Sequence, residues 1–386
     1  MLTEIWNVVR FGMRTLLNRH VLERELDDEL NFHLELEAER HERAGLSREE
    51  AMLRARAEFG HLDSIKEASR RARGSEALES WLHDLGENPR AVGVACAIAA
   101  AGLGLASMAA AGAPRLHLVV NGLALLVGLA SFGVLRSSSG HAPLLPGGVT
   151  LAFGGALIAT TLFGASVEGA SRWVRVGSLA VQLSLVLVPA MLVAFARQRD
   201  TLSTLGVILG ASALALQPDR AMAGVLAAAL AVLAVRRPDR WVVSALGVAA
   251  AGFAVTLLRP ETLPAVPYAD RVLRSAFEVH LLAGLAVVGG ALLLAVPAIP
   301  GRKLDSRNGD SYSVFGMVWL AVVLAAALGY SPTPLVGYSG SAVLGYLLSL
   351  AFLPGPVRSV AAAQRRVGHV QRAEAGAVLD LRLRIA

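Results

Sequence analysis

The sequence is poor in charged residues, in aromatic residues and in cysteine. Of its 386 residues, 17% are charged, 5% are aromatic and 54% are hydrophobic. Soluble domains carry about 25% charged residues, so this composition excludes a single soluble globular enzyme as well as a disordered chain. One cysteine, Cys96, leaves no disulfide framework and no cysteine-based metal site. The 38 glycines follow no three-residue period, which excludes a collagen-like chain.

The formal net charge of +6 divides unevenly along the chain. Residues 1–90 carry a net charge of −5, whereas residues 91–386 carry +11. A nucleic-acid-binding protein gathers its basic residues on a polar face. Here the arginines stand between long apolar runs, which is typical of membrane proteins, and we expect no nucleic-acid partner.

Residues 1–90 show the pattern of a small helical domain. Apolar residues recur at spacings of three and four up to Gly45, which is placed to end a helix. Ser47 and Glu50 then form a capping box, which predicts a second helix that runs to Phe59.

One face of the first predicted helix carries acids and histidines at four-residue spacing, namely Glu29, His33, Glu37 and His41. Such acid-rich faces are usually solvated, and no further ligand cluster completes a coordination shell. We therefore predict no metal site and no cofactor, and the sequence leaves open whether a divalent cation binds.

The rest of the chain is rich in segments long enough to cross a membrane, which takes about 20 mostly apolar residues. The candidate spans are residues 92–113, 116–135, 144–165, 176–196, 201–217, 220–235, 241–258, 276–298, 312–330 and 338–354. We predict an all-α polytopic membrane protein with about ten transmembrane helices over residues 91–355, after a small cytosolic helical domain at 1–90 and before a basic cytosolic tail at 356–386. The Lys and Arg balance between alternate loops favours both termini in the cytosol.

Few polar residues interrupt this body, and most lie in or near the loops predicted on the outer side. Glu278 falls just inside a predicted span, and burying an ionisable group there is costly, so it is a functional candidate. The outward arginines suit an anionic, phosphate-bearing substrate. They would equally suit lipid headgroups, and the sequence leaves both interpretations open.

The N-terminal part resembles a known module. The run Leu22–Leu34, the segment Gly45–Ala51 and the pair Phe59–Gly60 are similar to the permease prefix domain of bacterial MacB-like ABC permeases. The resemblance covers about residues 20–90. It implies a cytosolic module without a known active site, whose cytosolic partner is unknown.

Four motifs in the body resemble, in order, those of the SEDS family, the FtsW/RodA/SpoVE group. They are Gly169–Val174 (GASRWV), Val181–Ser184 (VQLS), Leu216–Asp219 (LQPD) and Pro334–Ser341 (PLVGYSGS). The resemblance covers about residues 92–355. It implies a ten-helix glycosyltransferase that polymerises lipid II at the outer face of the bacterial cytoplasmic membrane, usually with a class B penicillin-binding protein.

The same resemblance implies a set of site residues. The family's key aspartate lies between helices seven and eight, and Glu261–Asp270 partly resembles that segment, so Asp270 is the candidate catalytic base. Arg172 would hold the diphosphate or stabilise the charge of the leaving group. The implied substrate-binding residues are Arg172, Trp173, Gln182, Ser184, Asp219, Glu278, Tyr338 and Ser341.

The sequence also departs from the family pattern. Leu183 and Leu185 replace a proline and a glutamate, Val188 replaces a lysine, and the loop that holds Asp270 is short. Three interpretations therefore stay open: an active lipid II polymerase for cell division or cell shape, an inactive scaffold in a division or elongation complex, and a permease or transporter subunit. No Walker motif is present, so the third would need a separate ATPase chain.

Overall fold

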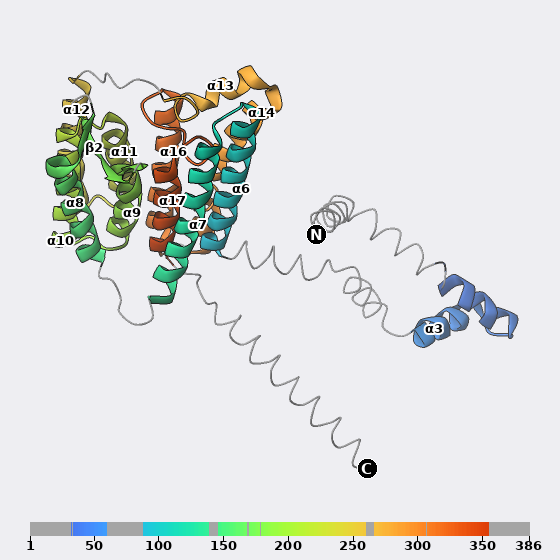
Figure 1. Ribbon diagram of the computed structural model, residues 1–386. Coiled ribbons are helices and arrows are strands. Elements are labelled where there is room, and N and C mark those ends of the chain that lie inside the picture. The colour runs from blue at the N-terminus through green and yellow to red at the C-terminus, as the bar shows by residue number, and fades with distance from the viewer. Residues whose placement is uncertain are drawn as a thin grey trace, which may run out of the picture. The chain divides into compact units, whose positions relative to one another are not determined.

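A computed structural model describes residues 32, 34–59, 88–138, 146–167, 170–177, 179–259, 266–305 and 307–354 (Figure 1). The chain divides into two units, Met1–Leu85 and Gly86–Ala386, and each is described by itself. Several predictions fall outside the described residues, namely the basic tail at 356–386 and, on the acidic face, Glu29 and His33. The domain limits at 90 and 355 and the prefix-domain resemblance stay predictions.

The first unit contains a helical hairpin. Residues 34–43 are helical, Gly45 follows in a left-handed conformation at φ +99°, and α3 (Arg48–Phe59) comes next. The capping box is confirmed, because the Glu50 N–H donates to Ser47 Oγ at 3.4 Å and the Ser47 N–H donates to Glu50 Oε2 at 3.3 Å. The two helices share a small core of Leu34, Ala38, Ala55 and Met52.

The second unit is a bundle of apolar helices that alternate in direction (Figure 1). Its long helices are α6 (Pro89–Ala110), α7 (Arg115–Ser138), α8 (Pro146–Phe163), α9 (Leu183–Arg197), α10 (Thr201–Leu216), α11 (Arg220–Arg236), α12 (Arg240–Leu257), α14 (Leu281–Leu293), α16 (Gly309–Ala327) and α17 (Gly340–Phe352). Two short helices, α13 (Val272–Val279) and α15 (Ala298–Leu304), flank α14.

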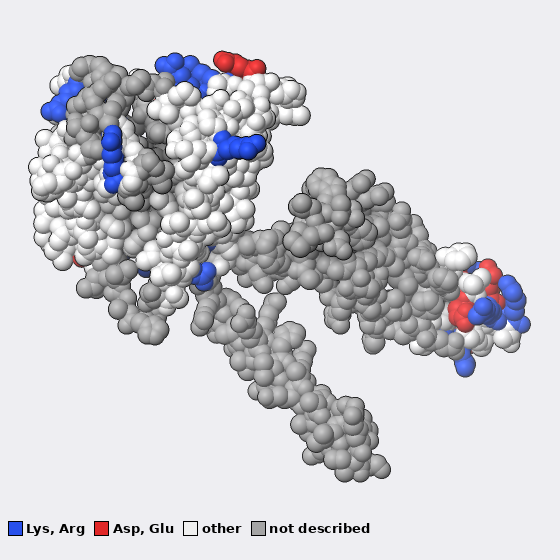
Figure 2. Space-filling view, viewed as in Figure 1, with Lys and Arg blue, Asp and Glu red and all other residues white. Residues whose placement is uncertain are grey.

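The predicted polytopic all-α fold class is confirmed. By length and composition, α6, α7, α12, α16 and the stretch Leu281–Leu304 qualify as membrane spans, and α8, α9, α10 and α17 are shorter apolar helices. Figure 2 shows the visible sides of this unit to be mostly uncharged. The count of ten spans stays a prediction.

A small antiparallel sheet precedes α9. Its strands are, in order, β1 (Ala165–Val167), β2 (Ala170–Val176) and β3 (Leu179–Gln182), and β3 lies where the sequence predicted a helix from residue 176. That helix start was wrong, because β-branched and aromatic residues favour strands and Gly177, at φ +62°, turns β2 into β3. The predicted span 276–298 is likewise divided, because α13 ends at Val279 and α14 begins at Leu281.

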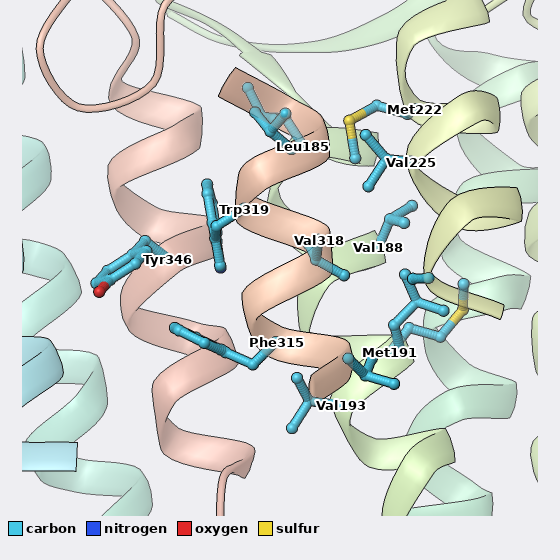
Figure 3. Close-up of a cluster of buried hydrophobic side chains, with 14 of the residues drawn as sticks. Leu185, Val188, Met191, Val193, Met222, Val225, Phe315, Val318, Trp319 and Tyr346 are labelled. Carbon is cyan, nitrogen blue, oxygen red and sulfur yellow. The ribbon is translucent and has the colours of Figure 1, made fainter. Parts of the chain in front are cut away.

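The core lies where α9, α11, α16 and α17 meet (Figure 3). Trp319 and Tyr346 stand edge to face with their ring centroids 5.0 Å apart, while Val318 of α16 faces the aliphatic side chains of α9 and α11. Trp319 Nε1 donates to Ser349 Oγ at 3.2 Å, and the Tyr346 hydroxyl donates to the Leu294 carbonyl at 3.3 Å. Both large aromatic residues therefore keep a hydrogen bond while they are fully buried.

Glycine permits the close contact between α8 and α10. A methyl group on Gly154 would overlap the Gly206 carbonyl, and one on Gly206 would overlap the main chain of Thr150. Small residues at such positions let two backbones approach directly, which suits helices that pack inside lipid. By contrast, the neighbouring Gly155 is exposed and has open space around its Cα.

Gly154→Ala should therefore destabilise the protein while Gly155→Ala does not. We expect Gly154→Ala to cost about 1–3 kcal/mol, because it forces the α8 and α10 backbones apart. Gly155→Ala should be neutral or stabilise by up to about 1 kcal/mol, because alanine is the better helix former. Unfolding midpoints in detergent measure both, and equal midpoints for the two variants would contradict the described contact.

Asp200 starts α10 at the end of the bundle opposite the sheet. Its Oδ1 accepts the Ser203 N–H at 2.7 Å, and this bond holds the pKa of the Asp200 carboxyl below its usual range. Asparagine caps helices about as well as aspartate, so Asp200→Asn is a mild substitution far from the sheet.

Candidate functional site

The turns at one end of the bundle, which we call the sheet end, bring the predicted site residues together. This end carries β1–β3 and α13 and is uppermost in Figure 1. Hydrogen bonds at this end connect the loops that follow α6, α8, α10, α12 and α16. The polar residues there form two separate groups.

Asp219 is the centre of the first group. It is the N-cap of α11, where its Oδ1 accepts the Met222 N–H at 3.2 Å. Arg172 Nη1 donates to the same oxygen at 3.3 Å. Asp219 Oδ2 accepts the Ser184 hydroxyl at 2.6 Å and the Gln182 amide at 3.2 Å.

The sheet brings these partners to Asp219. Arg172 lies on β2, Gln182 ends β3, and Ser184 stands in the first turn of α9. The register of β2 and β3 places Trp173 opposite Gln182, and the Arg172 guanidinium lies 5.3 Å from the centroid of the Trp173 ring.

The group is almost fully shielded from water. Arg172 is 4% exposed and Asp219 is 0% exposed. A buried charge is tolerated only when it is paired and hydrogen-bonded, which holds for this carboxylate. The Gln182 N–H also donates to Ser341 Oγ at 2.9 Å, so the Asp219 group ties the sheet, α9, α11 and α17 together.

Other arginines at this end donate hydrogen bonds to carbonyl groups at or near the ends of helices. Arg220 Nη2 donates to the Thr256 carbonyl in the last turn of α12 at 3.4 Å. It also donates to the Arg259 carbonyl, just beyond that helix, at 2.9 Å. Arg259 Nη1 lies 3.5 Å from the Leu216 carbonyl at the end of α10. Carbonyls at the end of a helix lack the N–H groups that a continuing helix would supply, and donors there stabilise the helix end, so we infer structural roles for both arginines.

Asp270 belongs to the second group, in the loop before α13. Its Oδ2 accepts the Val266 N–H at 2.7 Å, and its own N–H donates to the Val266 carbonyl at 3.0 Å. Tyr268 at φ +61° and Arg271 at φ +59° flank it in the left-handed conformation, which is unfavourable for residues with a side chain.

Main-chain bonds from the segment between α16 and α17 hold this strained loop. The Thr333 N–H donates to the Ala269 carbonyl at 2.8 Å, and the Tyr338 N–H donates to the Tyr268 carbonyl at 2.7 Å. The Tyr338 ring also stacks on His117, with centroids 4.0 Å apart. Tyr338 thus joins the Asp270 group, whereas Ser341, three residues later, joins the Asp219 group.

Glu278 does not lie where the sequence placed it. The prediction that it sits inside a spanning helix is wrong, because it is exposed on α13, ahead of α14. Its predicted contact with substrate stays a prediction. Among the described residues, no cluster of three His, Cys, Asp or Glu side chains could hold a metal ion.

Sequence reasoning missed Asn121 on α7. It is 2% exposed, its Nδ2 donates to the Gly337 carbonyl at 2.7 Å, and its Oδ1 accepts the Ser339 N–H at 3.2 Å. The available signal was a lone amide within an otherwise apolar run.

Comparison with solved structures identifies the fold. Rod shape determining protein RodA of Thermus thermophilus, in an Asp→Ala variant, matches with a TM-score of 0.50 and 22% identity, over 68% of this chain and 94% of that one. The chain has a SEDS-like fold. Unmutated RodA matches with a TM-score of 0.49 and 21% identity, over 68% of this chain and 94% of that one. A chain of a peptidoglycan synthase complex matches with a TM-score of 0.48 and 20% identity, over 68% of this chain and 95% of that one. Neither protein-family models nor curated sequences match the chain.

The SEDS-like fold confirms the resemblance that the four motifs indicated, at the level of architecture. Arg172, Gln182, Ser184, Asp219 and Ser341, predicted as one site, do lie in one hydrogen-bonded group. Trp173 lies against that group, whereas Asp270 and Tyr338 form the other. The catalytic and substrate-binding roles of these residues stay predictions.

Asp219→Ala should destabilise the SEDS-like bundle strongly. It leaves the buried Arg172 charge without its carboxylate, which typically costs about 3–5 kcal/mol. Replacing both charges at once, as Arg172→Met with Asp219→Leu, should recover part of that loss, because Gln182 and Ser184 keep a hydrogen bond to each other at 3.2 Å. Unfolding midpoints in detergent test this, and a double variant no more stable than Asp219→Ala would contradict the pairing.

Proposed function

We propose that this protein polymerises lipid II in peptidoglycan synthesis, at the outer face of a bacterial cytoplasmic membrane. The SEDS-like fold and the four motifs support the class of activity. The observation that carries the proposal is the loop of Asp270, where two left-handed residues and main-chain bonds from the α16–α17 segment fix one carboxylate at the sheet end. Strain of this kind clusters at active sites.

Asp270 is suited to the role of general base. Its Oδ2 is held by the Val266 N–H, while its Oδ1 makes no hydrogen bond within the described residues. In the proposed step, a sugar hydroxyl oxygen bonds to the anomeric carbon of the donor, and the bond from that carbon to the lipid diphosphate breaks. Asp270 takes the hydroxyl proton, and the diphosphate leaves with the electron pair.

Arg271 and Arg274 are placed to receive the diphosphate. Both side chains are exposed close to Asp270 in the sequence, and within the described residues neither side chain makes a hydrogen bond or ion pair. Arginine binds phosphate oxygens in pairs of hydrogen bonds and stabilises the developing negative charge. The buried Arg172 would have to leave Asp219 to bind an anion, so Arg271 and Arg274 are the more accessible arginines.

The proposal includes a partner and a topology. A class B penicillin-binding protein would cross-link the product, and the first unit would bind an unidentified cytosolic partner. With the sheet end outside, both termini lie in the cytosol, as the Lys and Arg balance predicts.

A scaffold without catalytic activity is the second candidate. Arg172, Gln182 and Ser184, which the resemblance gave to the substrate, are buried and bonded around Asp219 instead. A SEDS-like protein whose polar residues serve only its own packing would organise a division or elongation complex.

Glycan synthesis from labelled lipid II by the purified full chain, with and without a class B penicillin-binding protein, tests the proposal. Asp270→Asn removes the base with little change in size and should lower the rate at least 100-fold, as expected for loss of general base catalysis. The matched control is Asp200→Asn, the same chemical change at the opposite end, which should keep the wild-type rate.

The outcomes separate the candidates. Absence of product from the wild type under both conditions would contradict polymerase activity and favour the scaffold. An active wild type with an equally active Asp270→Asn would overturn the assignment of the base. Elution of each variant as a single species in detergent establishes that it has folded.

A further inference from the structure

We propose that Asn121 is a positioning residue that holds the loop of Asp270 in its strained conformation, acting through the turn Gly337–Ser339. That Asp270 is the base rests on the proposed function, whereas the mechanical link rests on the geometry alone. Within the described residues the hydrogen bonds of the Asn121 side chain go to Gly337 and Ser339 and not to the loop of Asp270, so its effect on that loop is indirect.

The Asn121 amide bonds one turn through both of its polar atoms. Its Nδ2 donates to the Gly337 carbonyl at 2.7 Å and its Oδ1 accepts the Ser339 N–H at 3.2 Å, so donor and acceptor clasp the turn on both sides of Tyr338. The side chain is 2% exposed and lies in a helix of apolar residues. A lone amide there is costly unless both of its polar atoms are bonded.

The turn that Asn121 holds is itself hydrogen-bonded to the loop of Asp270. The N–H of Tyr338, the residue at the middle of the clasp, donates to the Tyr268 carbonyl at 2.7 Å, two residues before Asp270. The turn and the loop are closely packed, because a methyl group on Gly337 would lie 3.2 Å from the Ala269 carbonyl oxygen. Displacement of the turn would therefore move Tyr268 and Ala269 directly.

The loop depends on such support. Tyr268 and Arg271 both hold left-handed conformations, which persist in residues with side chains only where the surroundings enforce them. The enforcing bonds come from Thr333 and Tyr338, and Asn121 fixes the second of these to α7.

Helix packing alone does not require this amide. Gly128 of α7 lies against Leu347, and Gly340 lies against Ala124, so α7 and α17 already meet through small and apolar residues. The amide adds hydrogen bonds to the turn that precedes α17, and its contribution is the position of that turn.

Two measurements on Asn121→Ala and Asn121→Leu test the inference. Amide hydrogen exchange, followed on peptides that cover residues 266–271 and 333–339, should become at least tenfold faster at Tyr338 and in the loop. Lipid II polymerisation should show a kcat lowered about 10- to 100-fold with a KM within twofold of wild type, because misplacement of a base affects the transition state. The matched control is Ser131→Ala, on the exposed face of the same helix, which should change neither.

A double variant separates positioning from general stability. If Asn121 acts through Asp270, then Asn121→Ala should lower the rate no further once Asp270→Asn is present. An equal fold-loss in both backgrounds would indicate a merely structural role and overturn the inference.

The exchange result stands independently of activity. Unchanged exchange in both loop segments would overturn the inference even if the rate falls. Inactive wild-type protein would contradict the proposed function alone, because faster exchange in Asn121→Ala would still support the link from α7 to the Asp270 loop.

Discussion

Asp219 carries a charge at the end of an apolar helical bundle, where water does not reach it. That charge is stable only because four groups meet it: the Arg172 guanidinium from β2, the Gln182 amide from β3, the Ser184 hydroxyl from α9 and the Met222 N–H from the first turn of α11 itself. The need to satisfy one buried carboxylate fixes where the sheet lies against α9 and α11. Through Ser341, it also fixes where α17 begins.

The start of α17 is shared by two groups with different roles. Ser341 belongs to the Asp219 group, which is buried and built around a carboxylate that accepts four hydrogen bonds. Tyr338 belongs to the Asp270 group, which is partly exposed and strained. A buried, hydrogen-bonded network suits a rigid structural joint, whereas an accessible carboxylate beside exposed arginines suits chemistry. We therefore propose that the first group stabilises the fold and that the second carries the reaction.

Much of the architecture could be predicted from the sequence. Apolar runs gave the polytopic helical class, and the SEDS-like motifs placed Arg172, Gln182, Ser184, Asp219 and Ser341 in one site, where the structure does join them. Spacing alone did not reveal that these residues satisfy one another, because hydrogen-bond partners depend on strand register and on helix ends. The strand at Trp173 was missed because the segment between the predicted spans 144–165 and 176–196, which carries Arg172 and Arg175, was interpreted as a loop.

Two further residues show where sequence reasoning stopped. Glu278 was predicted to be a buried acid because the apolar run continues past it. The helix is interrupted at His280, however, and Glu278 lies exposed on the short helix before the interruption. Asn121 was missed because its partners are main-chain atoms more than 200 positions away, which no local pattern encodes.

The central claim is that the Asp270 group binds substrate while the Asp219 group holds the fold. The most direct test is an experimental structure of the protein with a non-hydrolysable lipid-linked diphosphate sugar. We predict that the diphosphate lies beside Asp270 on Arg271 and Arg274, with Arg172 still bonded to Asp219. A diphosphate bound to Arg172, with Asp219 released from it, would contradict the account.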